Sequence, residues 1–362
     1  MNDHCWPSLL INPPTVPFLT SAPRNISIEI TGRCQLDCRH CFNDSGSEGC
    51  GDLPLVIVEK LLDQMASWNV DKVRITGGEP TVHDKFFDLI DACRQRGISV
   101  WLNSHGVYNT QLLDELKHAP IERFLISIDG VRENHEMIRG RGTFEHALHS
   151  CRALKQAGRN VSLTFHVGRE NRHDLTALVE IAADIGADFK VSPIRPVGRA
   201  RTELLDILLT PAQYLEVVRK VIDLRQRYPH ISLFTDFDIL DDMPSTSNPI
   251  PPAKTACHAG RSMVNISHEG DIYPCAFFVT PDKRFSAGNI YRDSLADVWQ
   301  HSPVFEPFRT QRKSDTCGNC SHYGNRCVGG CPATAYFTAG AIDAHDPMCF
   351  AGLLVPLRPA RP

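Results

Sequence analysis

Cysteine is the residue whose placement in this sequence says most about chemistry. The chain has 14 cysteines in 362 residues. Three of them lie between Cys34 and Cys41, and seven lie between Cys257 and Cys349. The N-terminal residues contain no continuous apolar segment of the secretory type, so we expect a reducing compartment. Clusters of this kind then predict metal ligands rather than disulfides.

The first group, Cys34, Cys38 and Cys41, can supply three thiolates to one metal centre. A [4Fe–4S] cluster has four irons and normally takes four cysteines, so three cysteines leave one iron open to a non-protein ligand. The spacing alone leaves two alternatives: a zinc ion completed by His40, or three cysteines with no common role.

The elements that would position this group alternate between strands and helices. The predicted strands are Ile26–Ile30, Lys72–Ile75, Ser99–Leu102, Phe124–Ile128, Val161–His166 and Asp188–Ser192, and the helices between them are Val56–Trp68, Lys85–Arg96, Thr110–Lys117, Thr143–Gln156 and Asp174–Ile185. This order predicts an α/β fold, a partial (β/α)6 TIM-type barrel, with an open doubly wound sheet as the alternative. The first cysteine group then lies at the carboxyl end of the first strand, where barrel enzymes build their sites.

The remaining sequence predicts a second, smaller domain. We divide the chain into an N-terminal extension (1–24), the barrel (25–240), a proline-rich linker (241–256) and a cysteine-rich C-terminal domain (257–362). A helix is predicted at Pro211–Arg227, a strand at Ile231–Thr235, and a hairpin from Met263–Ile266 and Asp271–Tyr273. The rest of the C-terminal domain has little apolar periodicity, so we expect metal binding, rather than a core, to hold it together.

The first cysteine group and four later motifs resemble those of the radical S-adenosylmethionine (SAM) superfamily. Its signature, C-x3-C-x2-C followed by an aromatic residue, is matched by Cys34, Cys38, Cys41 and Phe42. The GGEP motif is matched by Gly77, Gly78, Glu79 and Pro80, and SxDG by Ser127 and Asp129. Residues 102–106 stand where relatives read Thr-Asn-Gly, and Ser104 and His105 depart from that pattern. Arg139, with Arg141 as an adjacent alternative, stands where relatives place an arginine on the SAM carboxylate. The resemblance implies a SAM-binding [4Fe–4S] cluster, SAM bound by these residues, and an external one-electron donor of the flavodoxin or ferredoxin type.

The C-terminal cysteines resemble the SPASM domain, which carries auxiliary iron–sulfur clusters. By that resemblance Cys317, Cys320, Cys327 and Cys349 hold one auxiliary [4Fe–4S] cluster, and Cys257, Cys275 and Cys331 hold another. Some relatives carry a further cysteine where this chain has Met263, so the second cluster either has an open iron or takes another ligand. A zinc ribbon built from Cys317, Cys320, Cys327 and Cys331 is the alternative, and it leaves the other three cysteines unused.

Two residues are weak candidates for catalysis. Cys50 follows the first cysteine group in a glycine-rich segment, and its thiol could donate hydrogen to a product radical. His105 could donate a proton, but a histidine that only makes hydrogen bonds explains it equally well.

The resemblance favours a radical SAM enzyme that abstracts hydrogen from a peptide or protein, in crosslinking, epimerisation or oxidation. Oxidation of the sulfatase-maturing type ranks low, because Ala276 stands where those relatives carry an aspartate. A small-molecule enzyme of cofactor or natural-product biosynthesis, such as a haem-pathway decarboxylase or sugar epimerase, is the main alternative, and a non-catalytic electron-transfer protein is a second. Arg195 and Arg199 are candidates for contacts with SAM or a substrate carboxylate.

Charge and hydropathy restrict the partners. The formal net charge is −4, and no basic run with interleaved aromatic residues is present, so nucleic acid is not expected as a partner. No segment is long and apolar enough to predict a membrane span. We therefore expect a soluble, cytoplasmic protein.

Overall fold

The structure is a computed structural model that describes residues 21–46, 51–203, 207–235, 257–310, 314–320, 323 and 329–353. Residues 1–20 of the predicted extension, the linker 241–256, and two of the candidate residues, Cys50 and Cys327, lie outside the described residues.

A parallel sheet forms the wall of the barrel. Its strands are Asn25–Glu29 (β1), Lys72–Thr76 (β2), Ser99–Ser104 (β3), Arg123–Ser127 (β4), Val161–Val167 (β5), Asp188–Pro193 (β6) and Leu233–Thr235 (β7). Each strand from β1 to β7 pairs in parallel with the next one along the chain. This topology confirms the predicted partial barrel.

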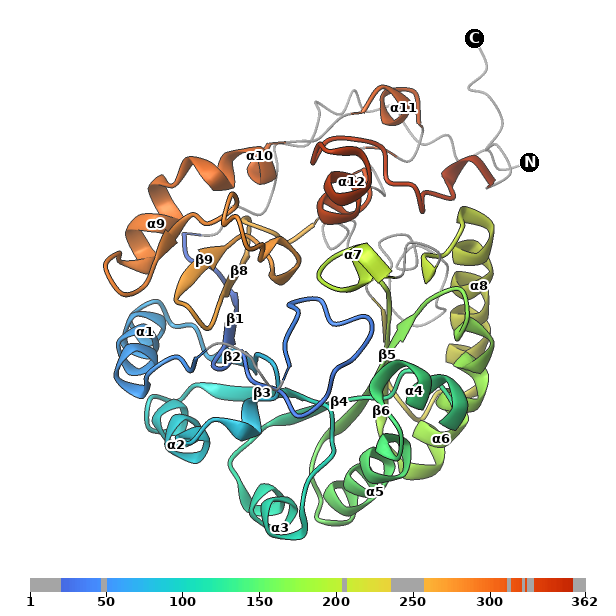
Figure 1. The fold of residues 1–362 in the computed structure, drawn as a ribbon, viewed down its shortest axis with the longest axis horizontal. Helices are drawn as coiled ribbons and strands as arrows, with labels where there is room; N and C mark the ends of the chain where they lie inside the picture. Colours follow the sequence, from blue (N-terminus) through green and yellow to red (C-terminus); the bar gives the residue numbers. More distant parts are fainter. Residues whose placement is uncertain are drawn as a thin grey trace, which may run out of the picture.

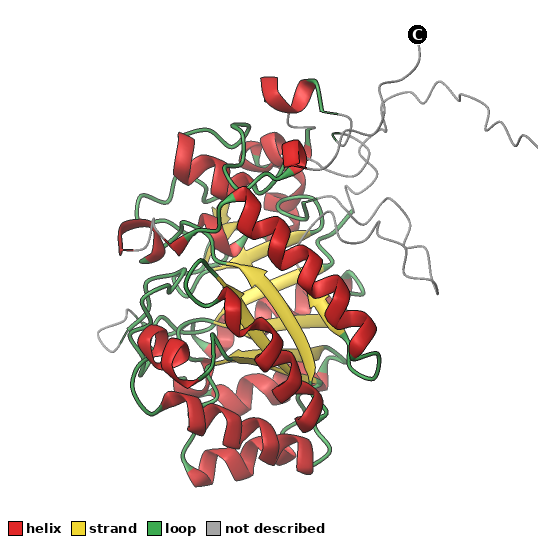
Figure 2. Cartoon of the chain, turned by 90° about the vertical axis from the view of Figure 1, so that its right-hand side faces the viewer, coloured by secondary structure: helices red, strands yellow, loops and turns green. Residues whose placement is uncertain are grey.

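Helices cover the outside of this sheet (Figure 1). They are Leu55–Ser67 (α1), Phe86–Gln95 (α2), Thr110–His118 (α3), Thr143–Gln156 (α5), Leu175–Ile185 (α6) and Pro211–Arg227 (α8), and two shorter helices, Arg132–Arg139 (α4) and Ala200–Glu203 (α7), follow β4 and β6. Figure 2 shows the same arrangement from the side, with the strands inside and the helices around them.

Local sequence explains most of these elements. Helix α1 buries Val58, Leu61, Leu62 and Met65, which share one face at helical spacing. Helix α8 begins with a capping box, in which the Thr210 side chain accepts from the Gln213 backbone and Pro211 occupies the first turn.

Helix α4 was not predicted. Its sequence, RENHEMIR, is mostly charged and polar, and it buries only His135 and Ile138. Two buried residues are too few to give a periodic signal, so its position depends on tertiary contacts rather than on amphipathicity.

The C-terminal region continues the barrel sheet. Its strands are Met263–Ile266 (β8), Asp271–Tyr273 (β9) and Gly288–Asn289 (β10). Strand β8 pairs in parallel with β1, placing Val264 opposite Ile26, so that one sheet of ten strands has the order β10-β9-β8-β1-β2-β3-β4-β5-β6-β7. The hairpin was predicted, but its pairing with β1 was not.

The remaining elements of this region are short. The helices are Leu295–His301 (α9), Glu306–Arg309 (α10), Asp315–Gly318 (α11) and Pro332–Ala339 (α12). Within the described part of the chain the 3-10 turns are Pro80–Val82 (η1), Arg172–Asp174 (η2), Ala276–Phe278 (η6), Pro303–Phe305 (η7) and Ala351–Leu353 (η8). Among the helices of the described residues, none combines the length and apolarity that crossing a membrane requires.

The expectation that the C-terminal region lacks a core is wrong. Leu295, Trp299 and Phe305 are buried in the main hydrophobic core of the barrel. A second core cluster gathers Tyr273 and Phe278 with other residues of this region. These apolar residues come from several short elements, so no single periodic pattern in the sequence predicts the core they form.

Candidate active site

The three cysteines of the first group line one cavity at the carboxyl ends of the strands, in the loop that follows β1. This loop is the blue segment that crosses the middle of the ring of strands in Figure 1. Two backbone amides point at its sulfurs: Leu36 N–H donates to Cys34 Sγ at 3.4 Å, and Ser45 N–H donates to Cys41 Sγ at 3.4 Å. Amide donors of this kind favour sulfur that carries negative charge.

The chemistry of these thiols fits an iron–sulfur cluster. Burial, with a contribution from the neighbouring thiols, raises the pKa of Cys34 to about 12 and that of Cys41 to about 11. Burial also raises the pKa of Cys38, although Arg139 opposes this shift. Thiolates are therefore favoured in this loop only when a metal centre supplies positive charge.

The spacing of the sulfurs argues against a single zinc ion. A zinc–sulfur bond of about 2.3 Å brings tetrahedral ligand sulfurs to roughly 3.8 Å from one another. Among the described residues, the only three histidine, cysteine or acidic ligand atoms that all lie within 4.8 Å of one another belong to His40, Asp129 and His166. The sulfurs of Cys34, Cys38 and Cys41 are therefore too widely spread for one zinc ion, as expected for a larger cluster. His40 Nε2 contacts Asp129 at 2.8 Å.

The glycines of the second motif are required by close packing of backbone. A Cβ on Gly77, whose φ is 144°, would lie 2.3 Å from the Thr31 carbonyl oxygen, and one on Gly78 would lie 2.1 Å from the Arg33 carbonyl oxygen. The Gly78 and Glu79 amides donate to the same two carbonyls, each at 2.8 Å. The turn after β2 thus lies directly against the loop that follows β1 and carries Cys34, Cys38 and Cys41, which we call the cluster loop. From the sequence we explained these glycines only by the close approach of a ligand, and this backbone contact was missed.

Glu79 organises the neighbouring loops. Its buried carboxylate accepts from Ser104 Oγ at 2.8 and 2.9 Å and from the His105 amide at 3.0 Å. It also accepts from Thr81 Oγ1 at 2.7 Å, in the turn η1 that Pro80 begins. The cavity is lined by Gly77, Gly78, Ser104 and His105 rather than by Glu79 itself.

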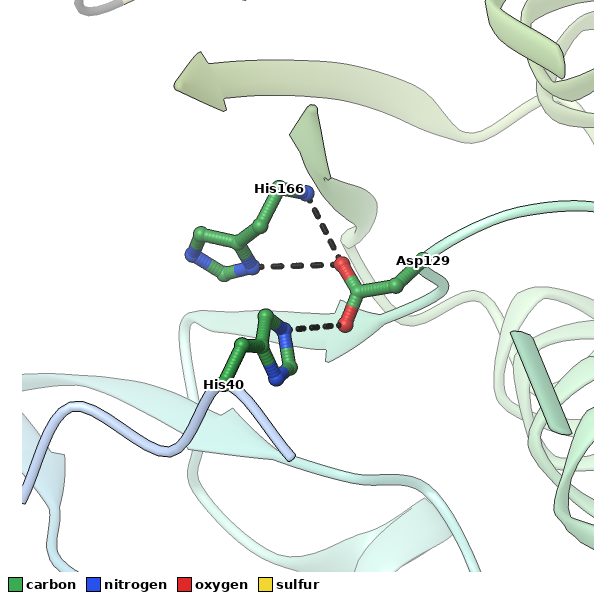
Figure 3. A group of neighbouring side chains, drawn as sticks. All are labelled: His40, Asp129 and His166. Atoms are coloured by element: carbon green, nitrogen blue, oxygen red, sulfur yellow. Dashed lines mark hydrogen bonds and ion pairs between the residues drawn. The ribbon is translucent and has the colours of Figure 1, made fainter. Parts of the chain in front are cut away.

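Asp129 is the centre of a charged network beside the cavity (Figure 3). Its fully buried carboxylate accepts from His40 Nε2 at 2.8 Å and from Arg139 Nε at 2.5 Å on one oxygen. The other oxygen accepts from the His166 amide at 2.8 Å and lies 3.3 Å from His166 Nδ1. Burial alone would raise the pKa of Asp129, but Arg139 and His40 hold it well below its usual range.

The Asp129 group does not provide a second metal site. Arg139 already occupies the oxygen that His40 shares, and its Nη1 lies 3.8 Å from Cys38 Sγ. The guanidinium thus supplies the positive charge that a metal would bring. Arg139 and Ser127 both line the cavity, as the family motifs predict, and His166 is a further lining residue that the sequence analysis missed. Only its position at the end of β5 could have indicated it.

Residues from the cluster loop, from the loop after β6 and from the C-terminal region complete a cavity of about 140 Å³. Its lining includes Phe42 from the cluster loop, Arg195 and Arg199 from the loop after β6, and Phe277 from the turn that follows Cys275. Phe42 and Phe277 pack edge to face, with ring centroids 6.1 Å apart. The cavity therefore extends from the first cysteine group to the C-terminal region.

The C-terminal cysteines gather into two groups. The pKa of Cys275 is raised to about 12, mainly by burial and in part by Cys257 and Cys331. Burial likewise raises the pKa of Cys349, and Cys317 and Cys320 contribute to that shift. The structure thus brings Cys257, Cys275 and Cys331 together, and Cys349 with Cys317 and Cys320, in the grouping that the SPASM resemblance implies. A zinc ribbon needs Cys331 with Cys317 and Cys320, and Cys331 lies in the other group.

Comparisons with known proteins agree with this geometry. Residues 28–182 match the model of the radical SAM superfamily, and residues 257–321 match the SPASM iron–sulfur cluster-binding domain. The mycofactocin maturase MftC of Mycobacterium ulcerans is 30% identical over 92% of this chain and 90% of its own. An AdoMet-dependent heme synthase of Methanosarcina barkeri is 27% identical over 91% of this chain and 97% of its own.

A solved structure shows the same fold. Streptococcus suis SuiB, bound to the precursor peptide SuiA, superposes with a TM-score of 0.74 at 19% identity, covering 91% of this chain and 76% of that one. The motifs, the barrel and the sequence relatives together show that the chain belongs to the radical SAM superfamily and is an enzyme with a C-terminal SPASM domain that uses SAM and [4Fe–4S] clusters.

Proposed function

We propose that this enzyme modifies a peptide or protein by abstracting hydrogen from one of its C–H bonds, in a crosslinking, epimerisation or oxidation reaction. The observation that carries the proposal is the continuous cavity between the first cysteine group and Phe277 of the C-terminal region. The similarity to a maturase at 30% identity supports a peptide substrate, and the SuiB complex is an example of this fold with a precursor peptide bound.

In this proposal Cys34, Cys38 and Cys41 hold the SAM-binding cluster. Gly77, Gly78 and Ser104 surround the amino group of SAM, with Glu79 fixing this wall from behind. Ser127 and Arg139 face its carboxylate from β4 and α4. Arg139 is suited to this role because Asp129 fixes its guanidinium through Nε and Nη1 lies against Cys38 Sγ, which orients this bidentate donor beside the first cysteine group.

When bound and reduced, the cluster and SAM supply a 5′-deoxyadenosyl radical, which takes a hydrogen atom from the substrate. The task of the protein is to position the substrate and to exclude water. Phe42 and Phe277 line the cavity with apolar rings that pack against each other, and His166 also lines it. An external flavodoxin- or ferredoxin-type protein would supply the electron, which is consistent with a cytoplasmic enzyme.

The C-terminal cysteines are proposed as auxiliary-cluster ligands, with Cys257, Cys275 and Cys331 in one site and Cys317, Cys320, Cys327 and Cys349 in the other. The first of these sites is next to the cavity, because Phe277 follows Cys275 by two residues and lines it. A cluster there would be placed to accept an electron from substrate or to bind it. Ala276 offers no base beside Cys275, which disfavours oxidation of the sulfatase-maturing type.

The second candidate is a small-molecule reaction, and the similarity to a heme synthase at 27% identity favours it. In that case Arg195, which lines the cavity, would meet a substrate carboxylate. The two candidates differ in the size of the substrate and share the radical chemistry.

The test is anaerobic reconstitution with iron and sulfide, followed by an assay for 5′-deoxyadenosine with SAM and dithionite. The reduced enzyme is then incubated with a synthetic copy of each short peptide that a search of the neighbouring genes finds, and in parallel with the substrates of any biosynthetic enzymes encoded there. We expect 5′-deoxyadenosine together with a mass change in the peptide. A mass change in a small molecule alone would favour the second candidate, and no 5′-deoxyadenosine from iron-loaded protein would contradict both.

A further inference from the structure

The segment 193–199, which comprises the last residue of β6 and the loop that follows it, contacts both the loop that carries the first cysteine group and the C-terminal region. It lines the cavity with Pro193, Ile194, Arg195, Val197 and Arg199. Its start is held to the barrel by the Ile194 amide, which donates to the Val167 carbonyl at 2.9 Å. We call residues 193–199 the bridging loop.

One end of the bridging loop packs against the backbone of the first cysteine group. The Arg199 amide donates to the Cys41 carbonyl at 3.0 Å. Gly198 has a φ of 54°, and a Cβ there would lie 2.3 Å from the Cys41 carbonyl oxygen and 2.4 Å from that of Phe42. Only glycine allows this approach, so the contact is a specific feature of the sequence.

The Arg199 side chain extends across the cluster loop. Its guanidinium pairs with Asp37 and with Asp44, the latter at 3.2 Å, and donates to the Ser45 carbonyl. The Arg199 side chain is 14% exposed, whereas those of Asp37 and Asp44 are 86% and 72% exposed. A largely buried cation thus joins two acidic residues that lie on opposite sides of the Cys38–Cys41 turn in the sequence.

The other end of the bridging loop reaches the C-terminal region. Arg195 Nη1 donates to Thr334 Oγ1 in α12 at 3.2 Å. Val197 is buried in the aromatic cluster of Tyr273 and Phe278. The segment that holds Arg199 is therefore fixed from both sides.

We propose that Arg199 is a positioning residue that fixes the Cys38–Cys41 turn for the SAM-binding cluster and raises the reduction potential of that cluster. This inference rests on the proposed function, in which Cys34, Cys38 and Cys41 hold the cluster. A cation beside the loop stabilises the reduced, more negatively charged cluster, so its removal makes reduction harder. The contact was not evident from the sequence, which suggested that Arg199 binds SAM or substrate.

The experiment compares the reconstituted full-length wild type with R199Q, R199K and the control R201Q. Arg201 belongs to the next helix and lies over the Phe337 ring, 5.8 Å from its centroid, away from the cluster loop. Three quantities are measured: iron content, the change in the EPR spectrum of the reduced protein on addition of SAM, and the midpoint potential of the SAM-responsive signal. For R199Q we expect a several-fold smaller SAM-responsive signal and a more negative potential, for R199K a smaller loss with a near-normal potential, and for R201Q no change.

A second variant separates the electrostatic role of Arg199 from a loss of signal that arises only because R199Q folds poorly. D37N/D44N removes the two exposed partners of Arg199 without leaving a hole in the core. It should also weaken the SAM-responsive signal, but the loss of two negative charges should move the potential in the positive direction, opposite to R199Q. Potentials that shift together in both variants would contradict the electrostatic role.

Wild-type iron content, SAM response and potential in R199Q would overturn the inference and leave the proposed function intact. A wild-type protein with no SAM-responsive cluster would overturn the proposed function and the inference with it.

Discussion

The first cysteine group and the group of Cys257, Cys275 and Cys331 have very different surroundings. The first is next to ionic contacts: Arg139 lies 3.8 Å from Cys38 Sγ and pairs with the buried Asp129. The second packs against an aromatic cluster in which Phe278 contacts Phe285 and Phe308, with ring centroids 4.6 and 4.9 Å apart. A site lined by charge suits a zwitterionic ligand such as SAM, whereas an apolar site suits an electron carrier or an apolar substrate.

The largest effect should come from removing each cysteine group in turn. Cys34→Ala/Cys38→Ala/Cys41→Ala should abolish 5′-deoxyadenosine formation and lower the iron content by about four per chain. Cys257→Ala/Cys275→Ala/Cys331→Ala should lose a similar amount of iron but retain 5′-deoxyadenosine formation within about tenfold, because SAM binds at the other site. Iron counting and chromatography of 5′-deoxyadenosine distinguish the two variants. Equal loss of 5′-deoxyadenosine in both would contradict the assignment of SAM binding to the first cysteine group alone.

Phe278→Ala tests whether packing or metal binding stabilises the aromatic cluster beside Cys257, Cys275 and Cys331. Phe278 is 1% exposed, and its removal should destabilise the folded protein by about 3–5 kcal/mol. Phe234→Ala, at a position that is 45% exposed on β7, is the control and should change stability by less than about 1 kcal/mol. Denaturant unfolding before iron is added measures both, and a Phe278→Ala protein as stable as the control would show that metal, not packing, dominates.

Asp129→Asn tests whether the ionic contacts beside the first cysteine group are needed for SAM cleavage. Asparagine preserves the shape of the side chain but not the charge that orients Arg139 and His40, so 5′-deoxyadenosine formation should fall about 100-fold, equivalent to about 2.7 kcal/mol. The exposed Asp114, which pairs with Lys117 on α3, gives the control Asp114→Asn. If both variants cleave SAM at the wild-type rate, the network around Asp129 has no role in binding SAM.

The smallest effect concerns Glu29, at the junction of the two regions. Its buried carboxylate accepts from Asn265 of β8 at 2.8 Å, and burial raises its pKa from 4.5 to about 7. Because the folded pKa is the higher one, the stability it contributes is complete below about pH 4.5 and is lost as pH rises through about 7. The wild type should therefore lose roughly 2 kcal/mol between about pH 5 and pH 8 relative to Glu29→Gln.

The measurement is the difference between the two unfolding curves at each pH. Taking the difference matters because burial lowers the pKa of the nearby His268, whose contribution is instead lost as pH falls. A difference that does not change with pH would show that Glu29 has the same pKa in the folded and unfolded protein, and would contradict the raised pKa of this buried carboxyl.

Sequence patterns predicted the barrel well because its elements repeat. The predicted strand Val161–His166 appears as β5, Val161–Val167, and the predicted helix Pro211–Arg227 has the same bounds in α8. The C-terminal core was missed because Trp299, Phe305 and Phe278 lie on short elements without a common period. Arg139 lines the cavity and was named by a family motif, whereas His166 lines it and was missed, because no motif names it and only its position at the end of β5 brings it there.

The sequence by itself determined the ligand chemistry and the order of the elements, because cysteine spacing and hydrophobic periodicity are local properties of the chain. The tertiary structure alone decided which distant segments meet: β8 pairs with β1, Arg199 lies across the cluster loop, and Glu79 receives the Ser104 hydroxyl. These contacts join residues far apart in the sequence, and they depend on how the sheet curves and on which backbone segments can approach.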